Sequence, residues 1–320
     1  LCPILADRVY PRGPIVGVQP DNENSFFFRT APFDLDYSEP SLALYRKFLA
    51  EKYPDIDNLN LVYGTSFDDH SSVSPPRSFE PDGAENLPYY FDWAQYRELY
   101  LFYGVHRTAR MLRERGLDEV VYFHNFPSAY PVSPFHAPKL ESQIDIAGID
   151  LYKGRKDYES IKTAARFLAG SSRLPFSPEL GAGGWLWWKP LFPQDQQFAA
   201  RAALMNGVKA FNLYMLADRE RWYGAPVARD GRKRETFDFY LNLNRFLHEN
   251  SFHEYRMRSD VLLLGIADYE RLEQMQSLLD PLPGFEPCSA LPQDWFVPRT
   301  PVPGFRDPIG AMYKRQWRAM

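Results

Sequence analysis

Two glutamates follow short apolar runs at widely separated places in the chain. Glu23 ends the stretch VGVQPDNE, and Glu179 lies in PEL, after another β-prone run. If both runs are strands of one parallel sheet, their carboxyl groups can face each other, because parallel strands end at the same edge. Two opposed carboxyls are the minimum equipment for glycoside hydrolysis, in which one donates a proton to the leaving oxygen and the other attacks the anomeric carbon or activates water. The alternative is that each is an ordinary acid of a surface loop.

The elements that must position these acids are short apolar runs that alternate with amphipathic stretches. The patterns predict strands at residues 15–19, 120–124, 144–151, 175–179 and 209–215, and a later one at 260–266. They predict helices at 41–53, 92–115, 158–169, 194–206, 236–249 and 269–279. In the longest helix, Asp92 is the expected N-cap and Gly116 the expected stop. Apolar strands that are each followed by a helix are typical of parallel β/α units.

Several of these strands end in a polar or aromatic cluster, namely PDNEN, HNF, DLYKG, PELGAGGW and NLYMLADRERWYG. A (β/α)8 TIM barrel carries its catalytic groups at the C-terminal ends of its strands. A Rossmann-type sheet also binds ligands there, but the chain has no GxGxxG and no GxxxxGK[ST]. The pattern therefore favours an α/β fold of the TIM-barrel class.

Only five strands are expected before residue 220, whereas a complete barrel has eight. We therefore expect residues 1–254 to form the C-terminal part of a barrel, strands 4–8, with the earlier strands ahead of Leu1 in a longer parent. Residues 255–320 are expected to be a linker and the truncated beginning of a second α/β domain. Alone, such a piece would fold poorly, because its sheet has open edges. The stretch from Asn58 to Asn86, rich in Pro and Ser, is expected to be a long loop over the active face.

Composition excludes several classes of partner. The net charge is −4 and the pI about 5.9, which gives no basis for capture of nucleic acid or of an anionic membrane. No apolar run approaches the roughly 20 residues of a membrane-spanning helix. Two cysteines and no Asn-x-Ser/Thr sequence indicate a cytoplasmic location. Aromatic residues make up 16% of the chain, which suits sugar binding because flat rings stack on sugar faces.

The sequence lacks the motifs of other catalytic chemistries. The histidines form no HExxH motif and no Cys/His cluster, so no zinc site is expected. There is no GxSxG elbow of a serine hydrolase. Asp68, Asp69 and His70 are interpreted as a solvated loop. We expect neither a metal nor an organic cofactor.

The neighbours of the two glutamates carry a family resemblance. VGVQPDNE resembles the strand-four segment of family 35 and family 42 β-galactosidases, which are retaining clan A glycoside hydrolases built on (β/α)8 barrels. PELGAGGW and NLYMLADRERWYG resemble strands seven and eight of family 35, although LADR replaces that family's glycine-rich loop. LALYRKFLAEKYPDIDNLNLVYGTSF, FHNF, AGIDLY and RSDVLLLGIADYERL are similar to successive segments of family 42. The segments occur in the same order over about residues 10–275.

The resemblance implies roles for individual residues. Glu23 would be the acid/base and Glu179 the nucleophile of a retaining β-galactosidase. Asn22 would hold the sugar 2-hydroxyl, with a turn residue as the alternative. The remaining candidates for substrate binding, each with a structural role as the alternative, are Asn125, Tyr152, Trp185, Tyr214 and Trp222. Tyr152 would also donate to the nucleophile, and one ring of GWLWWKP would form the floor of the galactose subsite.

Two expectations and two alternatives about function follow from this reading. The substrate would be a β-galactoside or an oligosaccharide, and the protein could form a homo-oligomer through the domain after the barrel. A clan A glycosidase for another sugar, such as a β-glucoside, an α-L-arabinopyranoside or a galactan, remains open. So does a carbohydrate-binding barrel without turnover, because the loop after Met215 departs from the family pattern.

Overall fold

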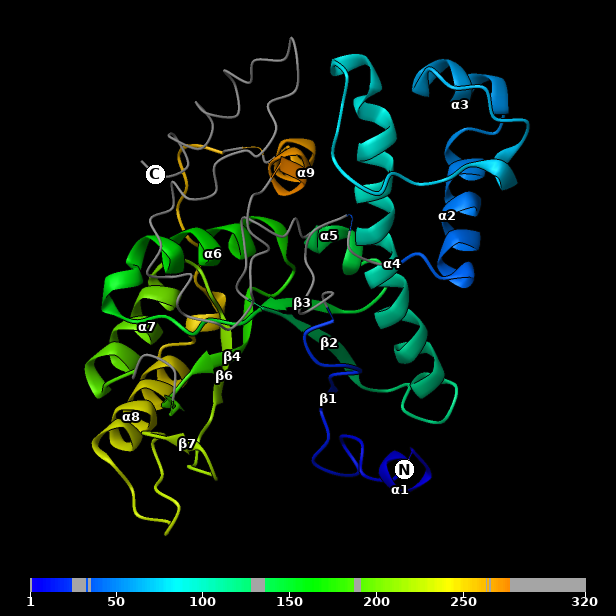
Figure 1. Ribbon diagram of the computed structural model, residues 1–320. Helices are drawn as coiled ribbons and strands as arrows, with labels where there is room; N and C mark the ends of the chain where they lie inside the picture. Colours follow the sequence, from blue (N-terminus) through cyan, green and yellow to red (C-terminus); the bar gives the residue numbers. More distant parts are fainter. Residues whose placement is uncertain are drawn as a thin grey trace.

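A curved parallel sheet forms the centre of the protein. The structure is a computed structural model, and it describes residues 2–24, 33, 36–127, 136–186, 191–262, 264 and 266–276. Within these residues the main sheet has the strand order β1-β2-β3-β4-β6, and all neighbours are parallel (Figure 1). Its strands are β1 (Gly17–Val18), β2 (Val121–Phe126), β3 (Ile146–Ile149), β4 (Phe176–Gly181) and β6 (Ala210–Tyr214). This is the sheet of a partial TIM barrel, and the five strands predicted before residue 220 are present.

Two short strands lie beside the C-terminal edge of this sheet, whereas the strand predicted at 260–266 is not observed among the described residues. β5 (Gly184–Trp185) and β7 (Trp222–Tyr223) form a small antiparallel pair. The strand predicted at 260–266 is wrong for the residues of that stretch that the structure describes. Val261, Leu262 and Leu264 are 64%, 78% and 70% exposed, and none of them lies in a strand. An apolar run adopts a strand only where a neighbouring strand pairs with it.

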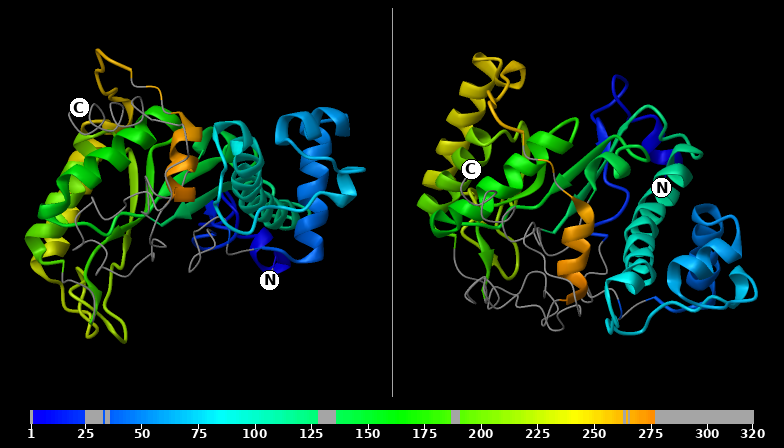
Figure 2. Two further views of the ribbon diagram at one scale, coloured as in Figure 1. Left: turned by 45° about the horizontal axis from the view of Figure 1, so that its top comes forward. Right: turned by 90° about the horizontal axis from the view of Figure 1, so that it is seen from above.

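Helices flank the sheet on its outer side. α6 (Tyr158–Ser171), α7 (Pro193–Met205) and α8 (Glu235–Glu249) follow one another along it, and α4 (Leu87–Arg113) flanks its other end (Figure 1). α2 (Glu39–Lys52) and α3 (Ile56–Tyr63) lie on the far side of α4 from the sheet (Figure 2). The shorter helices are α1 (Cys2–Ala6), α5 (Ala137–Leu140) and α9 (Ala267–Gln276), with 3-10 turns at 70–72, 84–86, 155–157 and 252–254. α9 covers most of the predicted helix at 269–279, and residues 277–320 lie outside the described part of the chain.

The start of α4 differs from the prediction. The helix begins at Leu87, with Pro in its first turn, so Asp92 is an interior residue and not the N-cap. Asp92 is 2% exposed, and it accepts hydrogen bonds from Lys52 Nζ at 2.5 Å and from the Tyr63 hydroxyl at 2.8 Å. Its carboxylate therefore ties α2 and α3 to α4. Gly116 lies just beyond the helix end with φ +92°, which agrees with its predicted role as a stop.

Part of the stretch predicted as a long loop is helical. α3 occupies its first residues, because the Asp55 side chain caps the helix N-terminus and Gly64 ends it at φ +67°. The lobe formed by α2 and α3 packs on α4 through an aromatic cluster centred on Trp93, which stacks on Tyr37 and meets Tyr45 edge-on at 5.0 Å. Between Gly64 and Leu87, two 3-10 turns are the only helical segments that the structure describes.

The core between sheet and helices consists of apolar side chains from both layers. Tyr122, Ile149 and Leu180 of the sheet and Ile161 and Leu168 of α6 belong to one buried cluster, each at most 1% exposed. A Leu or Ile that is fully buried in this way contributes on the order of 1.5–3 kcal/mol. This packing fixes β2, β3 and β4 relative to one another.

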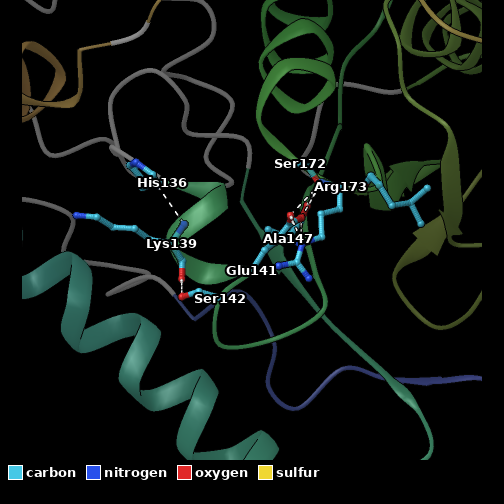
Figure 3. A network of polar contacts seen from close by, with 8 residues as sticks. His136, Lys139, Glu141, Ser142, Ala147, Ser172 and Arg173 are labelled. Carbon is cyan, nitrogen blue, oxygen red and sulfur yellow. Dashed lines mark hydrogen bonds and ion pairs between the residues drawn. The ribbon is translucent and has the colours of Figure 1, made fainter.

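A buried carboxylate anchors the N-terminal ends of two strands. Glu141, 4% exposed, accepts hydrogen bonds from the Ala147 amide at 3.0 Å, the Ser172 hydroxyl at 2.6 Å and the Arg173 amide at 2.9 Å (Figure 3). Ala147 lies in β3, and Arg173 leads into β4. Glu141 therefore fixes the two strands at the end opposite to the polar clusters.

No helix within the described residues is long and apolar enough to cross a membrane.

Candidate active site

Three carboxyl groups meet at the C-terminal edge of the sheet. Glu23 follows β1, Asp150 follows β3 and Glu179 lies in β4, and one oxygen of each lies within 4.8 Å of the others. Asp150 is fully buried, whereas Glu23 and Glu179 are partly exposed. The two glutamates predicted to face each other are thus brought together by the parallel strands.

Asn125 of β2 contacts all three of the residues that carry these carboxyls. Its Nδ2 atom lies 2.9 Å from Asp150 Oδ2, 3.3 Å from Glu179 Oε1 and 3.3 Å from Asn22 Oδ1. Its Oδ1 accepts the backbone N–H of Glu23 at 3.0 Å. The side chain is fully buried and its polar atoms contact protein groups. The prediction that Asn125 binds a sugar hydroxyl stays a prediction, and its observed contacts are those of an organising residue.

The backbone at Glu23 adopts a left-handed conformation that two residues of β2 hold in place. Glu23 has φ +45°, which costs a non-glycine residue about 1–2 kcal/mol. Asn125 accepts the N–H of Glu23, and His124 Nε2 accepts the N–H of Asn24 at 2.9 Å. Burial lowers the pKa of His124 to about 4, so at neutral pH the ring is uncharged and Nε2 has a free lone pair. We call these two contacts the backbone clamp.

The environment of the site raises the pKa values of its three carboxyl groups, with different contributions for each. Burial raises the pKa of Glu23 to about 7, and the charge of Glu179 adds to the rise, while a hydrogen bond with Asp150 opposes it. Burial, followed by the charges of Glu179 and Glu23, raises the pKa of Asp150 well above its usual range. Burial also raises the pKa of Glu179, against a hydrogen bond from Tyr152 that lowers it. Near neutral pH Glu23 is therefore close to the midpoint of its titration.

Tyr152 connects Glu179 to an aromatic wall. Its hydroxyl donates to Glu179 Oε2, and its ring can lie against β4 because residue 181 is glycine: a Cβ there would come within 2.9 Å of the Tyr152 ring. The Tyr152 ring lies 6.2 Å from that of Tyr214 and 6.3 Å from that of Trp222. Trp185 lies 5.8 Å from Trp222. We call Tyr152, Trp185, Tyr214 and Trp222 the aromatic wall.

The members of this wall differ in exposure. Trp222 is fully buried and donates its Nε1–H to the Ala182 carbonyl at 2.9 Å, so it supports the wall from behind. Tyr152, Trp185 and Tyr214 are partly exposed. All eight residues predicted for the site lie in the described part of the chain, at the C-terminal edge of the sheet or in the wall beside it. Trp187 and Trp188 lie outside the described residues.

Two residues of the site were not predicted as functional. Asp150 is the aspartate of AGIDLY, a segment to which the sequence analysis gives no catalytic role, and His124 is one of the histidines that form no metal-binding motif. Asp150 could have been found from its position, since it directly follows an apolar strand as Glu23 and Glu179 do. His124 could not, because its role depends on the path of a segment 100 residues earlier in the chain.

Carboxylate oxygens are also the ligands that hard cations prefer. Glu23, Asp150 and Glu179 could therefore offer oxygen atoms to such an ion. The oxygens of Glu179, however, accept hydrogen bonds from Tyr152 and Asn125, and Asp150 accepts one from Asn125. Hydrogen-bond donors arranged in this way stabilise and orient carboxyl groups that take part in proton transfer or nucleophilic attack.

The chain resembles known proteins along most of its length. The family model for glycoside hydrolase family 42, described as beta-galactosidase, matches residues 1–177. The structure is similar to a beta-galactosidase from Rahnella sp. R3, with a TM-score of 0.62 and 15% identity, over 87% of this chain and 46% of that one. An exo-beta-D-glucosaminidase of Pyrococcus horikoshii is 31% identical over 117 residues, which are 35% of this chain and 14% of that protein. A beta-1,2-glucosyltransferase of Ignavibacterium album is 24% identical over 265 residues, 74% of this chain and 36% of that protein.

The chain thus spans less than half the length of these relatives. The structural similarity supports the barrel fold, and the family match covers the segments that carry Glu23, Asn125 and Asp150. The match also decides between the two families that the sequence resembles. The chain belongs to glycoside hydrolase family 42.

Proposed function

We propose that this chain carries the catalytic carboxyls of a retaining β-glycosidase that hydrolyses terminal β-D-galactosides. One observation carries the proposal: oxygens of Glu23 and Glu179 lie within 4.8 Å of each other. Retaining glycosidases hold their carboxyls roughly 5–5.5 Å apart, whereas inverting enzymes leave about 6.5–9.5 Å for a water molecule. In this proposal the five parallel strands correspond to strands 4–8 of the barrel.

The reaction is a double displacement. In the first step a Glu179 oxygen attacks the anomeric carbon, the bond to the leaving oxygen breaks, and Glu23 gives its proton to that oxygen. The ester removes the charge of Glu179, so the pKa of Glu23 falls and its carboxylate becomes a base. In the second step Glu23 takes a proton from water, the water oxygen attacks the anomeric carbon, and Glu179 leaves as a carboxylate.

The surrounding residues support this chemistry. The hydrogen bond from the Tyr152 hydroxyl favours the ionised form of Glu179, against the burial that raises the pKa of this carboxyl. Asn22 lies beside Glu23, with Nδ2 at 3.4 Å from Glu23 Oε2, where it can bind the sugar 2-hydroxyl. Trp185 and Tyr214 offer partly exposed rings to the sugar, and Trp222 supports them. A cytoplasmic location and a homo-oligomer stay predictions.

A panel of aryl glycosides tests the proposal. The full-length protein is expected to release the aryl group from a β-D-galactoside faster than from a β-glucoside or an α-L-arabinopyranoside. Proton NMR of the first product should show the β-anomer, because two inversions retain configuration. Release of the α-anomer contradicts the double displacement. Faster release from the β-glucoside indicates a clan A glycosidase that is specific for another sugar. Sugar binding without release of any aryl group indicates a barrel without turnover.

Transfer to a sugar acceptor is a second candidate function. The relative from Ignavibacterium album that aligns with 74% of this chain is a beta-1,2-glucosyltransferase. In a transferase a sugar hydroxyl replaces water in the second step, and Glu23 would deprotonate that hydroxyl. Adding a disaccharide acceptor and measuring the ratio of transfer product to free sugar distinguishes the two. A ratio well above one at millimolar acceptor indicates a transferase.

The backbone clamp yields a prediction about His124. We expect His124→Ala to lower kcat for a galactoside with a poor leaving group by about 10- to 100-fold, because Glu23 no longer stays in its productive orientation. A 2,4-dinitrophenyl galactoside needs no protonation in the first step, so its first-step rate should change little. His248→Ala, on the exposed side of α8, is the matched control. Equal losses with both leaving groups would point to general misfolding instead, which a thermal melt would register.

A further inference from the structure

Arg219 places a positive charge at the outer end of the aromatic wall. It lies in the loop between β6 and β7, and its Nη2 donates to the Tyr214 hydroxyl at 2.8 Å. The guanidinium carbon lies 5.8 Å from the ring centres of both Trp185 and Tyr214. This is also the loop in which LADR replaces the glycine-rich segment of the related family.

The loop that carries Arg219 is anchored on both sides. The neighbouring Asp218 is paired with Arg234 at 2.6 Å and accepts the Ala225 N–H at 2.9 Å. The Arg219 carbonyl itself accepts the Trp222 N–H at 3.0 Å. Because its backbone is fixed in this way, Arg219 is presented from a defined position.

Tyr214 links the guanidinium to the reacting groups. Burial raises the pKa of Tyr214, the charge of Arg219 opposes the rise, and the charges of Glu179 and Glu23 add to it. The tyrosine hydroxyl therefore lies in the field of the two carboxyls on one side and of the guanidinium on the other. The aromatic wall thus extends from Glu179, through Tyr152 and Tyr214, to Arg219.

The guanidinium of Arg219 is not paired with a carboxylate within the described part of the chain. No carboxylate oxygen there comes within 4.0 Å of its guanidinium nitrogens, whereas Arg234, which contacts the same loop, is paired with Asp218. The reaction needs Glu179 in its ionised form, so an anionic substrate would be repelled unless a cation compensates. A guanidinium with free N–H groups binds a carboxylate or a sulfate through two parallel hydrogen bonds.

We propose that Arg219 binds an anionic group of the substrate, a uronic acid carboxylate or a sulfate ester. This group lies on the sugar unit that the scissile bond links to the terminal galactose. The inference rests on the proposed glycosidase function and narrows its substrate to acidic galactosides. The partly exposed Trp185 ring beside the guanidinium would stack on that sugar unit while Arg219 holds its charge.

Three disaccharides test the inference with the full-length protein: a neutral β-galactosyl disaccharide, its counterpart with a uronic acid next to the galactose, and its counterpart with a sulfate ester there. For the wild type we expect kcat/KM to be highest with one of the two acidic compounds, and which one it is identifies the anion. Arg219→Gln should lower kcat/KM for that compound by about 10- to 100-fold and for the neutral compound by a clearly smaller factor. Arg219→Lys should fall between, since it keeps the charge without the planar fork.

Arg221→Gln, an exposed arginine of the same loop, is the matched control and should leave the preference unchanged. Equal losses for all three compounds in Arg219→Gln, or a wild type that does not prefer an acidic compound, would overturn the inference. If the wild type cleaves none of the three, the proposed function fails separately. Calorimetric binding of the same compounds to wild type and Arg219→Gln then decides the inference by the ratio of affinities.

Discussion

Glu179→Ala in the full-length protein is expected to lower the hydrolysis of an aryl β-D-galactoside by roughly 10⁴-fold or more, because no covalent intermediate can form. The variant leaves a space beside the anomeric carbon that a small anion can enter. Azide should therefore react from the α face with a galactoside whose leaving group is activated. A single inversion then gives an α-galactosyl azide, which NMR identifies by its anomeric coupling constant.

Two further variants make this experiment decisive. Glu179→Gln keeps the volume of the side chain and should be equally slow without azide, but azide should rescue it poorly because the space is filled. Glu51→Ala removes an exposed glutamate of α2 and should behave as the wild type. A Glu179→Ala variant that melts normally and keeps near-normal hydrolysis would remove this residue from the reaction.

Glu23→Ala is expected to show the opposite stereochemistry and a dependence on the leaving group. The variant cannot protonate a poor leaving group, so its kcat/KM for such substrates should fall by about 10²- to 10⁴-fold. A 2,4-dinitrophenyl galactoside should still form the ester with Glu179, and the ester should then accumulate, because no base activates water. Azide needs no base, so it should release the sugar as a β-galactosyl azide. An α-galactosyl azide from this variant would exchange the roles of the two residues.

The pH profile gives an independent check of the same assignment. In the wild type, Glu23 must be protonated for the first step, and its pKa is about 7. The value of kcat/KM for a substrate with a poor leaving group should therefore fall as the pH rises through about 7. On the acidic side it should fall once Glu179 is protonated. Glu23→Ala should lose the alkaline decrease and keep the acidic one, and an unchanged alkaline decrease would assign that proton to another group.

Much of the fold follows from local patterns in the sequence. The five barrel strands were predicted because each is a short apolar run before an amphipathic stretch, although β1 pairs over only two residues. The start of α4 and the existence of α3 were not predicted. Asp92 has the typical residue type of an N-cap, yet its carboxylate is used by Lys52 and Tyr63, whose approach only the folded chain reveals. The prediction of a strand at 260–266 was wrong for a similar reason, because the pairing of one strand with another is not a local property of the sequence.

The site shows the same division. Glu23 and Glu179 could be related to each other because parallel strands end at one edge, a rule that needs no coordinates. The fully buried Asp150 and the contact of His124 with the backbone after Glu23 depend on distances across the sheet. The sequence therefore predicts the two glutamates that meet in the site, whereas the groups that orient them become visible only in the structure.

The backbone clamp has a consequence for how the sheet finds its alignment. β1 pairs with β2 only through Gly17 with Val121 and Val18 with Tyr122, which is a weak specification of register. A slip of one residue would move β1 along β2, whose own register is fixed by its pairing with β3. His124 and Asn125 would then no longer meet the N–H groups of Asn24 and Glu23, and the slipped sheet would lose both bonds. The residues that orient Glu23, the proposed acid/base, thus also specify the register between β1 and β2, and mutations that disturb β1 should impair assembly and turnover together.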